Sequence, residues 1–271
     1  MHKRPTQVIF TADDFGFCGE VNEAVERGHR DGVLSAASLM VGAPATQDAI
    51  ARARRMPRLA VGLHLTLVEG RPVLPAAVLP ALTMPDGAFH DDLVGAGVRW
   101  FFSRAARRQL RAEIRAQFEA FRATGLTLDH VNAHNHMHLH PTVLGLIIDL
   151  AKEFDVRAVR LPYEAPAAML APWMGLMKRR LKRAGLSFND RVVGMHATGH
   201  VNENLVLNKL AALPPGATEF YLHPAVRTTP ALEAAAPGYD RAGELAALTS
   251  ARVGARLKEL ALTPACFRDL S

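Results

Sequence analysis

The stretch QVIFTADDFG, residues 7–16, joins an apolar, β-branched run to a polar segment. Gln7–Thr11 predicts a short buried strand, and Ala12–Gly16 predicts an abrupt turn after it. Similar apolar runs recur along the chain and alternate with segments of helical periodicity. Further strands are predicted at residues 37–41, 59–67, 128–133, 156–161 and 218–222, and helices at 19–32, 46–56, 103–124, 142–153, 169–183, 204–213, 241–248 and 251–260. This alternation favours a parallel sheet covered by helices.

No linker-like stretch or internal repeat divides residues 1–271, so we expect a single domain. At this length a distorted or closed (β/α) barrel fits the pattern, and an open doubly wound sheet is the structural alternative. Residues 68–93 are rich in proline and lack periodicity, which predicts a long surface loop that faces the substrate.

The composition is typical of a soluble globular protein, with 49% apolar and 21% charged residues. No apolar run approaches the roughly 18 residues needed to span a bilayer, and Met1–Thr11 lacks the features of a signal peptide. We therefore expect the protein in the cytoplasm. The net charge of +6 permits acidic lipid, nucleic acid or an anionic substrate as a partner and does not choose among them. The only two cysteines, Cys18 and Cys266, leave metal binding to histidine and carboxylate.

Polar side chains stand at the ends of three predicted strands. They are the pair Asp13 and Asp14, then His64, then His134. The carboxyl ends of parallel strands form the active-site face of barrels and open α/β sheets, so these groups should meet there. Two imidazoles and a carboxylate can hold a divalent ion and leave positions open for water and substrate. Singly, the aspartates could instead cap a helix, and His64 could be a core histidine.

Residues 130–140 form a histidine-rich tract, HVNAHNHMHLH. Its even-numbered positions are polar, while residues 131, 133, 137 and 139 are apolar. In an extended chain this alternation places the polar groups on one face, toward a polar cleft. A solvated loop is the alternative, and the string His134-Asn135-His136 is weak support for an HNH nuclease because no ββα context is suggested.

Two more strands end in chemically useful residues. Arg160 closes the strand predicted at residues 156–161, and His223 follows the one predicted at 218–222. Arg160 can orient a carboxylate through a bidentate pair, and His223 can donate a proton. With the groups above, they complete the parts needed for metal-assisted hydrolysis.

The sequence resembles the YdjC-like carbohydrate deacetylases, also called the ChbG family. Five motifs carry the resemblance in this order: ADDFG at 12–16, GLHLT at 62–66, HNHMH at 134–138, RLP at 160–162 and LHP at 222–224. The resemblance implies a distorted (β/α) barrel of the polysaccharide-deacetylase-like kind that removes N-acetyl groups from amino sugars. It also implies that Asp14, His64 and His134 hold one divalent ion, Mg²⁺ or Zn²⁺, and that Asp13 is the general base.

Within that family the chain looks most similar to the hopanoid-biosynthesis-associated HpnK type, on the strength of VNAHNHMHLHP at 131–141 and EFYLHPA at 219–225. This likeness implies an N-acetylglucosaminyl hopanoid as substrate. Chitooligosaccharides or other N-acetylated sugars are the alternative. The remaining polar residues of these motifs are expected to bind substrate or to orient the metal ligands. They are Asn132, His136, His138 and Glu164, with His140 left open.

Residues 165–186 combine an apolar run with the basic cluster Lys178–Arg183. This composition is typical of a barrel helix with a solvated basic end, and the alternative is contact with an anionic membrane surface. With the loop at residues 68–93, the segment would form an apolar entrance for a lipid-linked sugar. We expect no nucleic-acid partner, and we leave open a homodimer and a location at the inner face of the membrane.

Three other functions remain open at this level. A metal-dependent phosphoesterase would assemble two metals about 4 Å apart with more carboxylates. A non-haem Fe(II) oxygenase shares the set of two histidines and one carboxylate. A basic lipid- or nucleic-acid-binding protein with a histidine-rich metal store would show no turnover.

Overall fold

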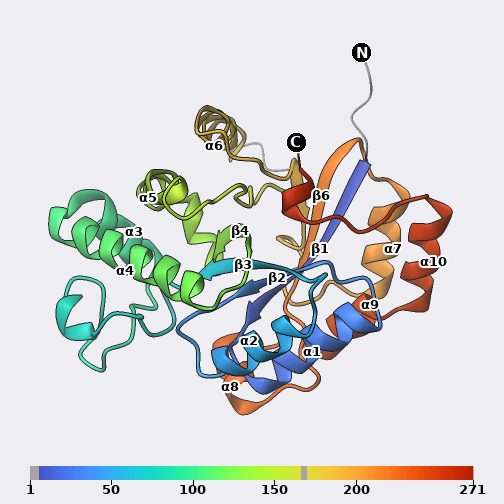
Figure 1. Ribbon diagram of the computed structural model, residues 1–271, viewed down its shortest axis with the longest axis horizontal. Coiled ribbons are helices and arrows are strands. Elements are labelled where there is room, and N and C mark those ends of the chain that lie inside the picture. The colour runs from blue at the N-terminus through green and yellow to red at the C-terminus, as the bar shows by residue number, and fades with distance from the viewer. Residues whose placement is uncertain (1–5, 166–169, 271) are drawn as a thin grey trace.

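Six parallel strands form the centre of the molecule. The computed structural model describes residues 6–165 and 170–270 (Figure 1). The strands are β1 (Thr6–Phe15), β2 (Ala36–Leu39), β3 (Ala60–Leu65), β4 (Leu128–Ala133), β5 (Arg191–Val193) and β6 (Gly216–Leu222). Their order in the sheet is β4-β3-β2-β1-β6-β5, and every pair is parallel. The central β1 is buried along its last eight residues, as its apolar sequence predicts.

Short backbone bridges close the gap between the two edge strands. Val131 of β4 pairs with Val159, and Ala158 pairs with Ser187, just before β5. The Val131 amide donates to Ala158 at 3.0 Å, and the Val159 amide donates to Ser187 at 3.0 Å. The curled sheet therefore confirms the expected distorted (β/α) barrel, although residues 156–161 form isolated bridges instead of the predicted regular strand.

Helices surround the strands, with α3, α4 and α5 on one side and α7, α9 and α10 on the opposite side (Figure 1). They are α1 (Gly19–Arg30), α2 (Thr46–Arg54), α3 (Leu93–Phe102), α4 (Arg104–Ala123), α5 (Pro141–Ala151), α6 (Ala171–Arg183), α7 (Glu203–Ala211), α8 (Pro230–Ala235), α9 (Arg241–Leu248) and α10 (Ala251–Glu259). Short 3-10 turns lie at Ala76–Val78, His134–Leu139 and Phe267–Asp269. Among the described residues, no helix is long and apolar enough to cross a membrane.

Several local predictions differ from the structure. The first strand continues to Phe15, so Asp13 and Asp14 belong to β1 and not to a turn after it. Pairing with β2 is resumed at Phe15 after an irregularity that begins at Ala12, and this pairing extends the strand. Helix α3, at the end of the predicted loop, and the three-residue strand β5 were not expected. Residues 166–169 of the predicted basic segment lie outside the described residues.

The histidine tract is not extended throughout. Strand β4 ends at Ala133, and a 3-10 turn begins at His134. Asn135 and His136 have φ values of 49° and 52°, in the left-handed region. The strict alternation over residues 130–140 is therefore wrong beyond Ala133, because the chain turns where the strand leaves the sheet. His130 and Asn132 still share the face that the alternation predicts.

Candidate metal centre

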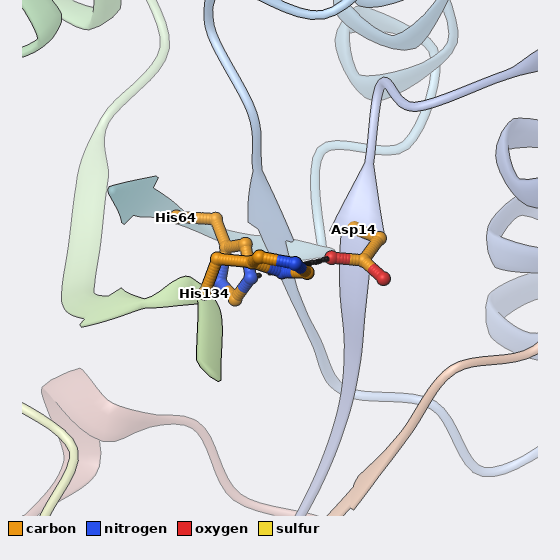
Figure 2. A group of neighbouring side chains, drawn as sticks. All are labelled: Asp14, His64 and His134. Carbon is orange, nitrogen blue, oxygen red and sulfur yellow. Dashed lines mark hydrogen bonds and ion pairs between the residues drawn. The ribbon is translucent and has the colours of Figure 1, made fainter. Parts of the chain in front are cut away.

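Three strand ends bring Asp14, His64 and His134 together (Figure 2). Asp14 lies near the end of β1, His64 in β3, and His134 directly after β4. Asp14 Oδ1 is 3.3 Å from His64 Nε2 and 3.2 Å from His134 Nδ1. One potential ligand atom from each side chain lies within 4.8 Å of the other two. The parallel strands thus produce the predicted meeting of one carboxylate and two imidazoles.

Asp14 adopts an unusual backbone conformation. Its φ of 62° lies in the left-handed region, at the irregularity between β1 and β2. A non-glycine residue there carries strain that surrounding contacts must hold in place, and such strain gathers at functional sites. The conformation lets two consecutive aspartates both serve the same end of the barrel, whereas regular pleating would send them to opposite faces.

Hydrogen bonding sets the tautomer of His64. The Asn132 amide nitrogen lies 3.1 Å from Asp13 Oδ1 and 2.8 Å from Ser38 Oγ, and because a carboxylate only accepts, the nitrogen faces this pair. Asn132 Oδ1 then faces His64 Nδ1 at 2.7 Å, so Nδ1 carries the hydrogen. His64 Nε2 is left as a buried lone pair, without a hydrogen-bond partner among the described residues, and it points at Asp14. A buried lone pair beside a carboxylate and a second imidazole fits a divalent ion.

His134 shows that this position favours positive charge. Burial by itself would lower its pKa, but Asp14 and Glu69 raise the pKa of His134 to about 10. Glu69 Oε2 lies 3.6 Å from His134 Nε2 and accepts a hydrogen bond from the Asn135 amide at 2.7 Å. A proton or a metal ion can supply the charge that these two carboxylates attract.

Asp13 is held by a buried arginine. Arg160 donates to both Asp13 oxygens, at 2.5 and 3.0 Å, and also to Glu219 in β6 at 2.6 Å. All three side chains are at most 2% exposed. Burial opposes ionisation of Asp13, but Arg160 and His64 hold its pKa well below the usual value. Arg160 therefore forms the predicted bidentate pair, and Asp13 is an oriented, ionised carboxylate.

A cavity of about 460 Å³ opens over these groups. Its lining includes Asp13, Asp14, His64, Glu69, His134, His136, Met195, Thr198, Tyr221, His223 and Tyr239. Burial lowers the pKa of His223 to about 4 and that of His136 to about 3, so both imidazoles are neutral at pH 7. His136 Nε2 lies 3.2 Å from the Tyr221 hydroxyl, which lies 3.1 Å from Thr198 Oγ1.

Three predicted residues lie away from this cavity. Glu164 accepts hydrogen bonds from the backbone amides of residues 194–196, at 2.7 to 3.2 Å, and so holds the turn that carries Met195. His138 is fully buried beside His136, with ring centroids 6.0 Å apart. His140 accepts from the Thr142 amide at the start of α5 and packs edge-on against Trp100.

Sequence reasoning missed several residues of the site. Glu219 and Tyr221 lie in the run EFYLHP that the sequence singled out, and their alternation along β6 could have placed both on the face of Arg160. Glu69 lies at the start of the loop that was expected to face the substrate, but no local pattern distinguishes it. Thr198 and Tyr239 come from irregular segments and leave no such signal.

The sequence matches a known protein family and several curated proteins. A family model described as "YdjC-like protein" matches residues 7–259. Proteins named "Carbohydrate deacetylase" are similar: that of Brevibacillus brevis is 37% identical over 160 residues, covering 58% of this chain and 60% of the relative. That of Vibrio cholerae is 38% identical over 152 residues, covering 55% and 57%. These alignments thus span less than two thirds of either relative. That of Geobacillus stearothermophilus is 29% identical over 269 residues, or 98% of both chains.

Two solved structures share the fold. A protein of Enterococcus faecalis, described as a candidate cellobiose-phosphate cleavage protein, superimposes with a TM-score of 0.81 at 23% identity and covers 98% of both chains. The lactam utilization protein of Thermus thermophilus gives a TM-score of 0.51 at 15% identity, covering 96% of this chain and all of its own. At these identities the likeness describes the fold alone.

Proposed function

This chain belongs to the YdjC-like protein family, and from that premise we propose that it is a metal-dependent deacetylase of amino sugars. The observation that carries the proposal is the buried lone pair of His64 Nε2, aimed at Asp14 and His134 beneath a sugar-sized cavity. The curated relatives named carbohydrate deacetylases support it. The reaction is hydrolysis of an acetamide, which releases acetate and a free amine.

Asp14, His64 and His134 would hold the ion. A divalent ion bound there supplies Lewis-acid polarisation of the carbonyl and acidifies water. Asp13 is the general base, because its carboxylate lines the cavity and is kept ionised by Arg160. With both oxygens held by Arg160, Asp13 is fixed in orientation, so it can take a proton from water without rearranging.

His223 is the proposed donor to the leaving amine. It follows β6, lines the cavity, and its Nδ1 is buried without a hydrogen-bond partner among the described residues. Because burial lowers its pKa to about 4, the ring starts neutral, so the proton that it passes to the amine is the one that Asp13 takes from water. A donor is needed because an amide anion is a very poor leaving group. Tyr221, whose pKa is raised by burial, stays protonated and can hydrogen-bond the substrate.

The proposed substrate is a lipid-linked amino sugar, an N-acetylglucosaminyl hopanoid, with chitooligosaccharides as the alternative. An apolar groove of about 560 Å³ adjoins the metal cavity and shares Leu93, Asn135 and His136 with it. The far end of the groove is formed by Leu170 and Trp173 at the start of α6. The groove offers an apolar path for a lipid that leads away from the sugar position.

Because the proposed substrate is linked to a membrane lipid, we also propose that the protein contacts an anionic membrane surface. Helix α3 exposes Val94, Val98, Phe101 and Phe102, the last at 76%. Phe101 packs edge-on against His140, which lines the groove. Exposed basic residues lie in α4, which packs against α3, and in α6, whose start forms the far end of the groove. They are Arg104, Arg107 and Arg108 in α4, and Arg179, Lys182 and Arg183 in α6. An apolar surface flanked by cations suits anionic headgroups.

Vesicle sedimentation tests the membrane contact. We expect binding to anionic vesicles that weakens when Phe101 and Phe102 become serine, or when residues 178–183 are neutralised. The variant Arg157→Met, which removes an exposed arginine paired with Asp155, is the control and should bind like wild type. Absence of vesicle binding together with a stable homodimer would contradict the membrane proposal, because a second copy would then cover the apolar face.

Acetate release tests the activity itself. Metal-stripped protein is assayed with Mg²⁺, Mn²⁺, Co²⁺ or Zn²⁺ restored, on N-acetylglucosaminyl hopanoid and di-N-acetylchitobiose in parallel. Metal-dependent release from the hopanoid alone supports the lipid-linked substrate, and release from chitobiose supports the alternative. No release from either, with metal bound, would exclude both proposed substrates and favour a phosphoesterase.

A further inference from the structure

A chain of hydrogen-bonded polar side chains, Asn132, Ser38, His130 and Asp129, runs from the candidate metal centre into the barrel interior; we call it the polar chain. Asn132 Nδ2, which already donates to Asp13, donates to Ser38 Oγ at 2.8 Å. Ser38 Oγ lies 3.0 Å from His130 Nε2, and His130 Nδ1 lies 3.0 Å from Asp129 Oδ2. Ser38, His130 and Asn132 are fully buried, and Asp129 is 2% exposed. None of Ser38, His130 and Asp129 lines the metal cavity.

The C-terminal turn anchors the far end of this chain. The backbone amides of Phe267 and Arg268 each donate to Asp129 at 3.2 Å, and Arg268 Nε donates at 3.0 Å. Burial opposes ionisation, but His130 and Arg268 keep the pKa of Asp129 below its usual value. Asp129 is thus an ionised carboxylate that can only accept hydrogen bonds.

The position of each hydrogen along the polar chain can be assigned in turn, starting from Asp129. Since Asp129 only accepts, His130 Nδ1 carries its hydrogen, and a neutral His130 accepts from Ser38 at Nε2. The Ser38 oxygen then accepts from the Asn132 amide nitrogen. Asn132 is therefore oriented from two sides, by Ser38 and by Asp13, so that its carbonyl oxygen faces His64 Nδ1.

The orientation of Asn132 decides whether His64 can bind a metal. If the amide were reversed, its nitrogen would face His64 Nδ1, and that nitrogen would have to accept. The hydrogen of His64 would then move to Nε2, the atom that points at Asp14. A protonated Nε2 cannot be a ligand. The polar chain acts against this state by giving the Asn132 nitrogen two acceptors.

Close packing fixes His130 in the chain. Its ring stacks on Phe267 with centroids 4.3 Å apart. On the neighbouring strand, a Cβ added to Gly62 would stand 2.4 Å from His130 Cε1. Glycine at residue 62 therefore leaves the space that the imidazole occupies.

We propose that Ser38, His130 and Asp129 are positioning residues that, through Asn132, keep Nε2 of His64 free for the metal ion. The inference rests on the proposed metal site and not on the identity of the substrate. It assigns a function to the C-terminal turn at Phe267 and Arg268, which orders the metal centre from the opposite end of the polar chain.

The test compares Ser38→Ala with Ser35→Ala. Ser35 also lies beside β1, where its hydroxyl hydrogen-bonds the Phe10 backbone, but it is outside the polar chain. Zn²⁺ dissociation constants are measured by chelator competition, and ¹⁵N shifts of the metal-free protein report which His64 nitrogen carries the hydrogen. We expect Ser38→Ala to weaken Zn²⁺ binding by about 10- to 100-fold and to populate the Nε2–H form. Ser35→Ala should match wild type in both.

A second variant decides the matter if Ser38→Ala does not fold. Asp129→Asn can turn an amide N–H toward His130 Nδ1, which moves the imidazole hydrogen to Nε2. Nε2 then donates to Ser38, and the freed Ser38 hydroxyl hydrogen can turn toward Asn132 and favour the reversed amide. This variant should give the same two changes. Wild-type Zn²⁺ affinity and tautomer in a folded Ser38→Ala or Asp129→Asn protein would overturn the proposal. Neither readout uses a substrate, so a failure of the deacetylase assignment would be seen separately, as zinc binding without acetate release.

Discussion

Replacing Arg160 by methionine removes a cation that lies between two buried carboxylates. Arg160 gives two hydrogen bonds to Asp13 and three to Glu219, and the three side chains are at most 2% exposed. Removing one partner of a buried ion pair costs about 3–5 kcal/mol, because the remaining charge stays buried and unpaired. We expect Arg160→Met to lower the free energy of unfolding by about this amount at pH 7, a large share of the roughly 5–15 kcal/mol typical of a folded protein.

The loss should depend on pH in a definite direction. In the wild type, the pKa of Asp13 is held below its value in the unfolded chain, so its stabilisation is present at neutral pH and is lost only in strong acid. Without Arg160, burial raises the pKa of Asp13 above the unfolded value, and the penalty grows as the pH rises. The difference between variant and wild type should therefore shrink as the pH falls from 7 toward 4, by about 1.4 kcal/mol per pH unit below the raised pKa.

Urea unfolding of the metal-stripped proteins at pH 7 and pH 5, followed by tryptophan fluorescence, measures both effects. Stripping the metal removes its own contribution to stability. Arg157→Met is the matched control, because Arg157 and Asp155 form a solvent-exposed ion pair at 3.0 Å. It should unfold like the wild type. A loss below about 1 kcal/mol for Arg160→Met, or a loss independent of pH, would refute the reasoning about the buried pair.

Four further substitutions separate the roles of individual residues. Asp13→Asn should still take up the metal, with a lowered affinity because Asn132 loses one of its two acceptors, and should lower kcat by at least about 100-fold. His64→Ala, which removes a proposed ligand, should lose the metal; equal metal loss in both variants, measured by calorimetry, would contradict this division. Gly62→Ala should lower stability by about 1–3 kcal/mol, because its Cβ meets His130 at 2.4 Å, and an unchanged urea midpoint would argue against that packing. Glu164→Ala should cost about 1–3 kcal/mol by leaving three backbone amides without their acceptor and should raise KM, and a variant with unchanged stability and KM would contradict this role.

The candidate metal centre could be predicted as a cluster because its residues lie at strand ends. Asp14, His64 and His134 lie far apart in sequence, but parallel strands end at the same edge of the sheet. The alternation of polar residues also placed Asn132 correctly, within β4. Sequence alone does not show how these side chains bond to one another. The orientation of Asn132 depends in part on Ser38. Ser38 lies in the short buried strand β2, AASL, where no local pattern marks it as a partner of Asn132.

Other features depend on contacts that no local pattern records. Glu69 reaches His134 because its loop returns to the barrel mouth, where Glu69 and His90 form a backbone hydrogen bond of 3.3 Å. Helix α3 was missed because its sequence, LVGAGVRWFF, is short and contains two glycines, which disfavour a helix. Strand β5 has only three residues, and its pairing with β6 defines it. The end of β4 was predicted correctly, but the alternation was carried on to residue 140, because positive φ values at Asn135 and His136 leave little trace in the sequence.

Locating the bound ion tests the central claim most directly. Crystals soaked in Zn²⁺ would be measured at the zinc absorption edge, where anomalous scattering marks the metal alone. We predict one peak, bonded at about 2.0–2.2 Å to Asp14, His64 Nε2 and His134. A peak held by other residues, no peak at full zinc occupancy in solution, or a second peak about 4 Å from the first would contradict the single-metal centre.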